Sequence, residues 1–225
     1  MSSKRAGDIS SVFYSRSKAV AYNLKDYYFQ KAKTENYAAR SIFKLQEIDE
    51  RYKIIRPGYK VLDLGAAPGS WSQYVSKKVG PQGRILGVDL QPVKLSLPNA
   101  VFITSDFRDV NFEEVMATHG IVPPFDVVLS DMAPNTTGIR ITDQTRSLEL
   151  CVLALETAEK YLRPRGSFIA KFFHGDDFGS FRDDLRKRFG RVEVLRPKST
   201  RKESKEIFFI ALQYNPLTPK KSEGC

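Results

Sequence analysis

A chain of 225 residues, 41% of them hydrophobic, is long enough for one buried core with extensions and carries a formal net charge of +10. No apolar run approaches the roughly 18 residues of a membrane span, and "MSSKRAGDISS" lacks the apolar core of a secretory signal, so we expect an intracellular, cytoplasmic protein. Cys151 and Cys225 have no metal-ligand spacing, so we expect neither structural zinc nor redox chemistry.

The excess positive charge lies at the two ends of the chain. Residues 1–60 carry 13 Lys and Arg against 6 Asp and Glu, residues 61–190 carry 15 against 16, and residues 191–225 carry 8 against 4. Basic ends on a nearly neutral centre are typical of a polyanion-binding surface, although solubility explains the charge alone equally well. We expect a basic, partly ordered arm over 1–30, one domain over 31–213 and a disordered tail over 214–225.

Helices and short apolar strands alternate after the arm. A helix is predicted within 37–55, because Ile42, Leu45, Ile48 and Tyr52 recur every three or four residues before Pro57. Further helices are predicted at about 70–79, 111–118, 143–162 and 179–189. Strands are predicted at 60–65, 84–89, 101–106, 125–131, 167–173, 191–197 and 206–213.

The strand pattern predicts an α/β fold. Continuous apolar strands separated by helices are typical of a parallel sheet with helices on both faces. The last two strands have no helix between them, which favours an antiparallel pair at one edge. We therefore expect a seven-stranded, mostly parallel sheet with an antiparallel last strand.

Aspartates mark the ends of four successive strands, where ligands bind in open α/β sheets. They are Asp63, Asp89, Asp106 and Asp131. Any one of them alone would more simply be an N-cap or turn residue. Four in succession indicate a ligand site.

The loop "DLGAAPGSW", residues 63–71, follows the first of these strands. Gly65 and Gly69 permit a tight turn close to a ligand, and Asp89 is suitably placed for ribose hydroxyls. The loop is not G-x-G-x-x-G, and Pro68 lacks an N–H that a pyrophosphate would use. A cationic nucleoside, S-adenosylmethionine, is therefore favoured over a nicotinamide dinucleotide, with Asp106 at the adenine edge and Asp131 near the sulfonium.

Lys171 interrupts the otherwise apolar strand "GSFIAKFF", residues 166–173. An ammonium in such surroundings would lose favourable hydration. Either its head group reaches solvent or a functional site uses it.

Five motifs together resemble the RrmJ/FtsJ family of RNA 2′-O-ribose methyltransferases: "VLDLGAAPGSWSQYV", "SDFRD", "LSDMAPN", "GSFIAKFFHG" and "SKEIFFIA". The similarity runs from about residue 25 to 213 and implies a Rossmann-like, S-adenosylmethionine-dependent methyltransferase. It also implies a catalytic tetrad of Lys44, Asp131, Lys171 and Glu206, and cofactor contacts from Gly69, Trp71, Asp89, Asp106 and Asp131. Trp71 is alternatively a core aromatic.

Two positions depart from the pattern of the resembled family. Ser70 stands where bacterial members usually have a second glycine, and His174 stands where glutamine is common. Neither departure removes a member of the tetrad.

Methyl transfer to a ribose hydroxyl requires alignment of the reacting atoms and an acceptor for one proton. A free lysine has a pKa near 10.4, so a lysine that acts as a base needs a pKa about 2 to 3 units lower. Our hypothesis makes Lys171 the base or the group that orients the hydroxyl, and Asp131 the group that positions Lys171. Lys44 and Glu206 would orient the ribose and the ammonium.

The expected partner is RNA, bound by the basic segment "RPKSTRKESK" at 196–205 and by the basic N-terminal flank. The resemblance implies 2′-O-methylation of a uridine in 23S ribosomal RNA. We further expect a monomer that uses no metal and no membrane. Two alternatives remain: a tRNA anticodon-loop ribose methyltransferase, and a non-catalytic RNA-binding factor in ribosome assembly.

Overall fold

The computed structural model of the protein describes residues 27–216. Residues 27–34 are helical, which covers the end of the expected arm; the rest of the arm and nearly all of the expected tail lie outside the described residues. The helices are α2 (Ile42–Tyr52), α3 (Ser70–Val79), α4 (Phe112–Thr118), α5 (Arg140–Tyr161) and α6 (Phe178–Arg188). The strands are β1 (Lys60–Leu64), β2 (Arg84–Asp89), β3 (Ala100–Thr104), β4 (Phe125–Ser130), β5 (Leu162–Phe173), β6 (Phe189–Leu195) and β7 (Glu206–Tyr214).

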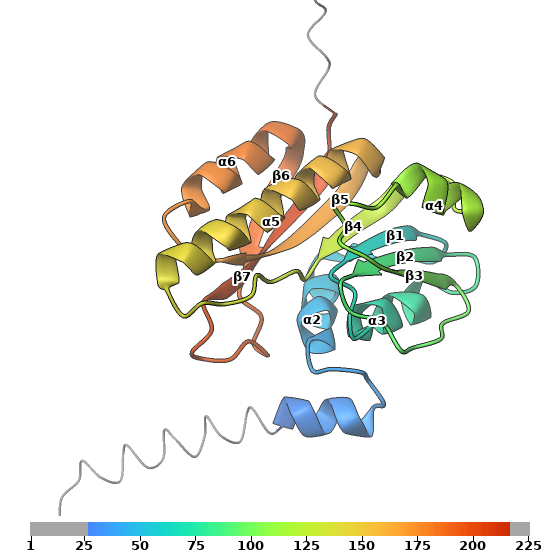
Figure 1. The fold of residues 1–225 in the computed structure, drawn as a ribbon, viewed down its shortest axis with the longest axis horizontal. Helices are drawn as coiled ribbons and strands as arrows, with labels where there is room; N and C mark the ends of the chain where they lie inside the picture. Colours follow the sequence, from blue (N-terminus) through green and yellow to red (C-terminus); the bar gives the residue numbers. More distant parts are fainter. Residues whose placement is uncertain (1–26, 217–225) are drawn as a thin grey trace, which may run out of the picture.

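The strands form one seven-stranded sheet in the order β3-β2-β1-β4-β5-β7-β6 (Figure 1). Strands β1 to β5 pair in parallel, and β7 is antiparallel to both β5 and β6. The α/β fold expected from the sequence, with its mostly parallel sheet and antiparallel last strand, is confirmed.

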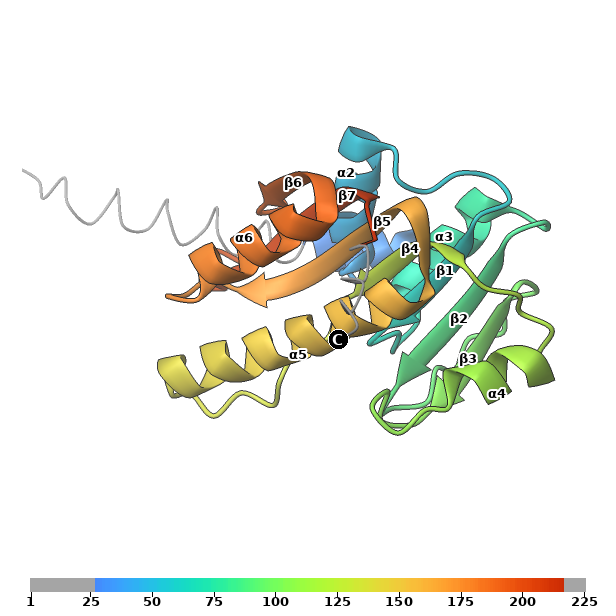
Figure 2. The same cartoon turned by 90° about the horizontal axis from the view of Figure 1, so that it is seen from above.

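Helices cover both faces of the sheet, with α2 and α3 on one face and α4, α5 and α6 on the other (Figures 1 and 2). Alternation along β5 directs Phe168, Ala170 and Phe172 to the α5 face and Ile169 to the α2 face. Lys171 follows Ile169 by two positions and therefore lies on the α2 face, near the carboxyl end of its strand.

Two elements begin three or more residues earlier than the apolar pattern predicts. Strand β5 starts at Leu162, where Leu162 pairs with Phe125 and the Arg163 guanidinium lies 2.6 Å from Asp126. Helix α5 starts at Arg140, because the Asp143 carboxylate accepts hydrogen bonds from the N–H groups of Thr137 and Gly138 at the preceding turn. Both early starts depend on polar contacts that hydrophobic periodicity does not reveal.

Within residues 27–216, no helix is both long and apolar enough to cross a membrane.

Candidate active site

A pocket of about 500 Å³ opens at the carboxyl ends of β1 to β4. Three of the predicted acids, Asp89, Asp106 and Asp131, line it. The other lining residues are mostly apolar or neutral: Gly65, Ala67, Pro68, Val88, Leu90, Gln91, Ser105, Phe107, Arg108, Met132, Ala133 and Leu150. Three carboxylates among apolar walls suit a cationic ligand that also carries an apolar ring.

The two glycines of the loop after β1 allow it to pass close to the Met132 backbone and to the Leu95 side chain. Gly65 has φ +80°, and a Cβ there would lie 2.9 Å from the Met132 backbone nitrogen. Gly69 has φ +104°, and a Cβ there would lie 2.6 Å from Leu95. Side chains at either position would push the loop off the pocket, as expected for glycines in a ligand-binding turn.

Asp89 and Asp106 are held in place by neighbouring donors. The Asp89 carboxylate accepts the Ala67 N–H at 2.9 Å and the Gln91 N–H at 2.8 Å. Arg108 donates to both oxygens of Asp106, and these hydrogen bonds hold the pKa of Asp106 below its ordinary value. An ionised carboxylate has about four acceptor sites, so both acids retain capacity for a ligand.

Asp63, grouped with the strand-end acids in the sequence, occupies a different place. It lies within β1, fully buried on the α3 side, where the Ser72 hydroxyl donates to its Oδ2 at 2.6 Å. Its Oδ1 has no hydrogen-bond partner among the described residues. Burial, opposed by the Ser72 hydrogen bond and reinforced by Asp131 and Asp89, raises the pKa of Asp63 to about 7.

Lys171 contacts Asp131 across two adjacent parallel strands. The Lys171 Nζ lies 3.0 Å from Oδ1 of Asp131 and donates a hydrogen bond to the Asp131 backbone oxygen. The side chains are only 9% and 17% exposed. Within residues 27–216, no well-directed hydrogen bond reaches Oδ1, so this contact is an ion pair that leaves acceptor capacity at the carboxylate.

Lys44 and Glu206 form a second ion pair, between α2 and the first residue of β7. The Lys44 Nζ lies 2.6 Å from Oε1 of Glu206, with both side chains about one-eighth exposed. Glu206 pairs in register with Phe173, and Lys171 pairs with Phe208. The antiparallel register therefore brings Glu206 beside the strand position that carries Lys171.

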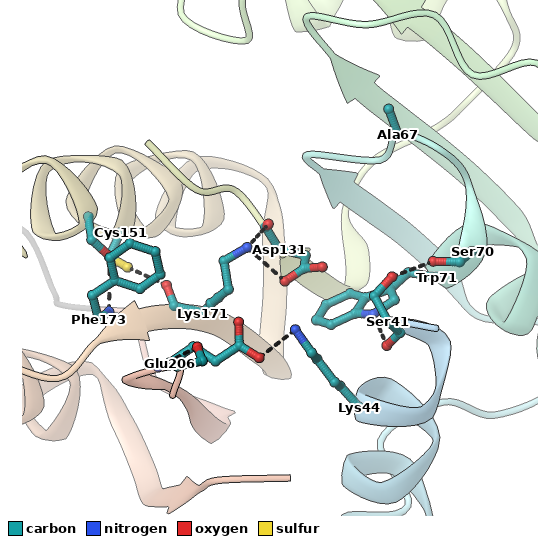
Figure 3. A network of polar contacts seen from close by, with 12 residues as sticks. Ser41, Lys44, Ala67, Ser70, Trp71, Asp131, Cys151, Lys171, Phe173 and Glu206 are labelled. Carbon is teal, nitrogen blue, oxygen red and sulfur yellow. Dashed lines mark hydrogen bonds and ion pairs between the residues drawn. The ribbon is translucent and has the colours of Figure 1, made fainter. Parts of the chain in front are cut away.

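The two pairs gather at one place on the carboxyl edge of the sheet (Figure 3). Lys44, Asp131, Lys171 and Glu206 come from α2, the end of β4, β5 and β7, so residues far apart in sequence are brought together as the hypothesis requires. Asp131 belongs to both the tetrad and the pocket wall. A hydroxyl held by the lysines would thus face a ligand in the pocket.

Trp71 places its side chain in the core instead of the pocket. Its indole is 2% exposed, packs against Phe208 with ring centroids 5.8 Å apart, and donates from Nε1 to the Ser41 oxygen at 2.9 Å. The alternative of a core aromatic is therefore correct for the ring. The cofactor contact expected at Trp71 would therefore have to come from its backbone, in the first turn of α3.

A second pocket of about 300 Å³ adjoins the Lys44–Glu206 pair. Its lining residues are Arg40, Ser41, Lys44, Arg201, Glu203, Ser204 and Glu206. The Arg40 guanidinium donates to the Ser199 oxygen, while its Nη1 is buried without a hydrogen-bond partner among the described residues. Burial and then the charge of Arg201 lower the pKa of Arg40, while Glu206 and Glu203 oppose this change, and a bound anion would oppose it further.

A family model described as FtsJ-like methyltransferase matches residues 37–214. The chain belongs to this family. The methyltransferase expected from the sequence is confirmed.

Two FtsJ-like relatives are named ribosomal RNA large subunit methyltransferase E. The protein from Bdellovibrio bacteriovorus is 60% identical over 193 residues, covering 86% of this chain and 98% of that protein. One from Nitratidesulfovibrio vulgaris strain Miyazaki F is 53% identical, covering 84% of this chain and 94% of that protein.

Solved structures agree with the fold. The crystal structure of a ribosomal RNA methyltransferase from Plasmodium falciparum has a TM-score of 0.70 and 26% identity, covering 80% of this chain and all of that one. Aeropyrum pernix fibrillarin, solved with bound S-adenosyl-L-methionine, shares the fold alone, with a TM-score of 0.50 and 20% identity over 71% of this chain and 68% of that one.

Sequence reasoning missed the hydrogen bonds that connect the elements of this FtsJ-like site. Ser41 was not singled out, although it contacts both Ser70 and Trp71. Arg108 was visible in "SDFRD" but was not assigned to Asp106. Serine and arginine are common on surfaces, so only their positions in the fold distinguish these residues.

Proposed function

We propose that this FtsJ-like chain methylates a ribose 2′-hydroxyl in large-subunit ribosomal RNA, with S-adenosylmethionine as the methyl donor and a uridine of 23S RNA as the target. The observation that carries the proposal is the meeting of the Lys171–Asp131 and Lys44–Glu206 pairs at the mouth of the acidic pocket. The name shared by relatives at 60% and 53% identity supports the choice of RNA.

The hydrogen-bond donors and acceptors that line the acidic pocket match the groups of S-adenosylmethionine. When bound, this cofactor supplies an electrophilic methyl group on a sulfonium. Asp89 and Asp106 are fixed acceptors for ribose and adenine groups, and Asp131 offers a negative charge to the sulfonium side. The Gly69 N–H donates to the Ala66 oxygen at 2.7 Å, but the first turn of α3, which includes Trp71, has no side-chain cap, so its N–H groups are available to a carboxylate.

Lys171 handles the proton of the ribose hydroxyl in this proposal. Once its ammonium has given up a proton, its neutral amine would accept the 2′-hydroxyl proton as the methyl group passes from the sulfonium sulfur to the ribose oxygen, and Asp131 would stabilise the ammonium that results. Lys44, fixed by Glu206 at 2.6 Å, donates to the ribose and holds it against rotation. Alignment and proton transfer are thus carried by different lysines.

The second pocket and the segment that follows β6 serve the RNA backbone. Arg40, with its buried and unpartnered Nη1, and Arg201 present two guanidinium groups beside Lys44. Phosphates on either side of the target ribose would pair with them. Arg196 instead donates to the backbone oxygens of Arg201 and Lys202, so it shapes the segment.

Four residues of one chain complete the site, so we propose that the enzyme acts as a monomer. Its relatives from Bdellovibrio bacteriovorus and Nitratidesulfovibrio vulgaris are named for ribosomal RNA, and we therefore propose that the chain acts in the cytoplasm.

Methyl transfer from radiolabelled S-adenosylmethionine to purified ribosomal particles, free ribosomal RNA and tRNA tests the proposal. We expect label in large-subunit RNA, in an alkali-resistant dinucleotide, as 2′-O-methylation blocks cleavage there. Label in tRNA alone would favour an anticodon-loop enzyme. Absence of label with every substrate, together with retained RNA binding, would favour a non-catalytic assembly factor.

A further inference from the structure

The first turn of α3 is joined to the first turn of α2 by two partly buried hydrogen bonds. The hydroxyls of Ser70 and Ser41 lie 2.7 Å apart, and the Trp71 indole N–H donates to the Ser41 backbone oxygen at 2.9 Å (Figure 3). Ser70 and Trp71 are each only 2% exposed. These bonds connect the loop that borders the cofactor pocket to the helix that carries Lys44.

Ser41 also begins the helical turn on which Lys44 lies. The same Ser41 oxygen that receives the indole N–H accepts the Lys44 backbone N–H at 3.0 Å. Helix α2 has no side-chain cap of its own at Ser41. Its first turn is therefore held from outside, by Ser70 and Trp71, more than by local capping.

The Trp71 ring also contacts a side chain that lies next to the Lys44–Glu206 ion pair. It packs against Phe208, and the Lys44 Nζ lies 5.8 Å from the centroid of the same Phe208 ring. Phe208 and Glu206 lie on one face of β7, two residues apart. Trp71 thus supports both partners of the Lys44–Glu206 pair.

We propose that Ser41, Ser70 and Trp71 are positioning residues, which hold Lys44 in register with the Lys171–Asp131 pair for the proposed methylation. None of the three needs to touch the ribose. The serine at position 70 contributes a hydroxyl link that a glycine there would lack. The position of Lys44 therefore depends on the position of the cofactor loop, residues 63–71.

Kinetics of Trp71→Phe test the proposal, because this change removes the indole N–H and keeps an aromatic ring. We expect kcat for RNA methylation to fall about 3- to 10-fold, with S-adenosylmethionine affinity within about twofold of wild type, as for loss of one hydrogen bond that acts through alignment. Ser70→Ala should have a smaller effect of the same kind. An unchanged kcat in Trp71→Phe overturns the proposal.

A double-mutant comparison separates positioning from general structural damage. In the Lys44→Ala background, Trp71→Phe should cause no further loss of kcat, because its effect passes through Lys44. Multiplicative losses would overturn the proposal. Tyr74→Phe is the matched control, since it also deletes an aromatic donor of α3, to buried Asp49, and should lower the melting temperature with kcat retained.

Hydrogen exchange tests the same link without any RNA. Amides of residues 42–45 should exchange faster in Trp71→Phe than in Tyr74→Phe and wild type. Equal protection in Trp71→Phe overturns the proposal. If wild-type protein methylates no RNA, the proposed function fails, while this measurement still decides whether Trp71 holds the first turn of α2.

Discussion

The two halves of the sheet's carboxyl edge have opposite charge. Strands β1 to β4 present the pocket lined by Asp89, Asp106 and Asp131. On the other side, α2, β5 and the segment before β7 present Lys44, Lys171 and the two arginines Arg40 and Arg201. The acidic half suits a cationic donor, whereas the basic half suits a polyanion.

The boundary between the halves is the contact of Asp131 with Lys171. Both residues come from neighbouring parallel strands, so sheet register fixes their distance. The Lys44–Glu206 pair joins a helix to a strand, and its geometry depends on how α2 docks. The candidate active site therefore combines a rigid contact set by the sheet with one set by side-chain packing.

Lys171→Ala removes the contact between Asp131 and Lys171 and should have the largest effect on methylation. Loss of the group that receives the hydroxyl proton is expected to lower kcat about 10²- to 10⁴-fold. Single-turnover methylation of ribosomal RNA measures it, with circular dichroism to verify folding, because Asp131 loses its ionic partner. Lys171→Arg keeps the charge and should also be slow; near-normal turnover in either variant would remove Lys171 from the mechanism.

Asp63→Asn tests whether burial and the neighbouring carboxylates of the acidic half raise the pKa of Asp63. The pKa of Asp63 is raised from 3.8 to about 7, so the folded protein binds more protons than the unfolded chain between these values. Wild-type stability should therefore fall as pH rises from 4 to 8, by roughly 3 to 4 kcal/mol from this group alone. Asparagine cannot ionise, so Asp63→Asn should gain relative to wild type as pH rises.

Urea unfolding of wild type and Asp63→Asn at several pH values measures this difference. The control is Asp109→Asn, which removes a carboxylate from an exposed position. Parallel curves for Asp63→Asn and wild type would show that Asp63 is ionised throughout.

Asp89→Asn tests whether the acidic half binds S-adenosylmethionine independently of RNA binding by the basic half. Removing the charge that accepts ribose hydroxyls should weaken S-adenosylmethionine binding about 10- to 100-fold, since hydrogen bonds to charged groups contribute roughly 1.5–3 kcal/mol. Isothermal titration calorimetry measures the affinity. RNA affinity should stay the same, and an equal loss for both ligands would indicate that the halves are not independent.

Arg201→Ala should give the smallest effect, confined to the basic half. One lost phosphate contact should weaken RNA binding severalfold and reduce the slope of log affinity against log salt by about 1. Filter binding at several salt concentrations measures the slope, and S-adenosylmethionine affinity should not change. Exposed Arg56, just before β1 at the opposite edge of the sheet, supplies the control as Arg56→Ala, which should keep the wild-type slope.

The sequence predicted the sheet well, because its strands are continuous apolar runs whose identity does not depend on distant contacts. Lys171 was recognisable for the same reason, as a charge in such a run. The tetrad required resemblance to a family, since Lys44 and Glu206 are ordinary helix and strand residues until the fold pairs them at 2.6 Å.

Sequence spacing alone could not decide which way a side chain points. Trp71 follows the glycine loop directly, yet its ring lies in the core against Phe208. Asp63 stands one residue from the end of β1, yet the pleat directs it under α3 and away from the pocket. A shift of one residue changes the face, and sequence spacing does not determine which acid meets the ligand.

The position of β7 inside the sheet has a consequence for how such an enzyme changes its substrate. Strands β5 and β6 flank it, and the His174 N–H donates to the Lys205 oxygen just before Glu206. The sheet and the His174 contact therefore anchor the start of β7, and the Glu206 N–H also donates to the Ser204 hydroxyl at 3.2 Å. We expect residues 196–203 to tolerate exchange of their basic side chains while Glu206 stays in place, so that RNA preference can change without a change in the candidate tetrad.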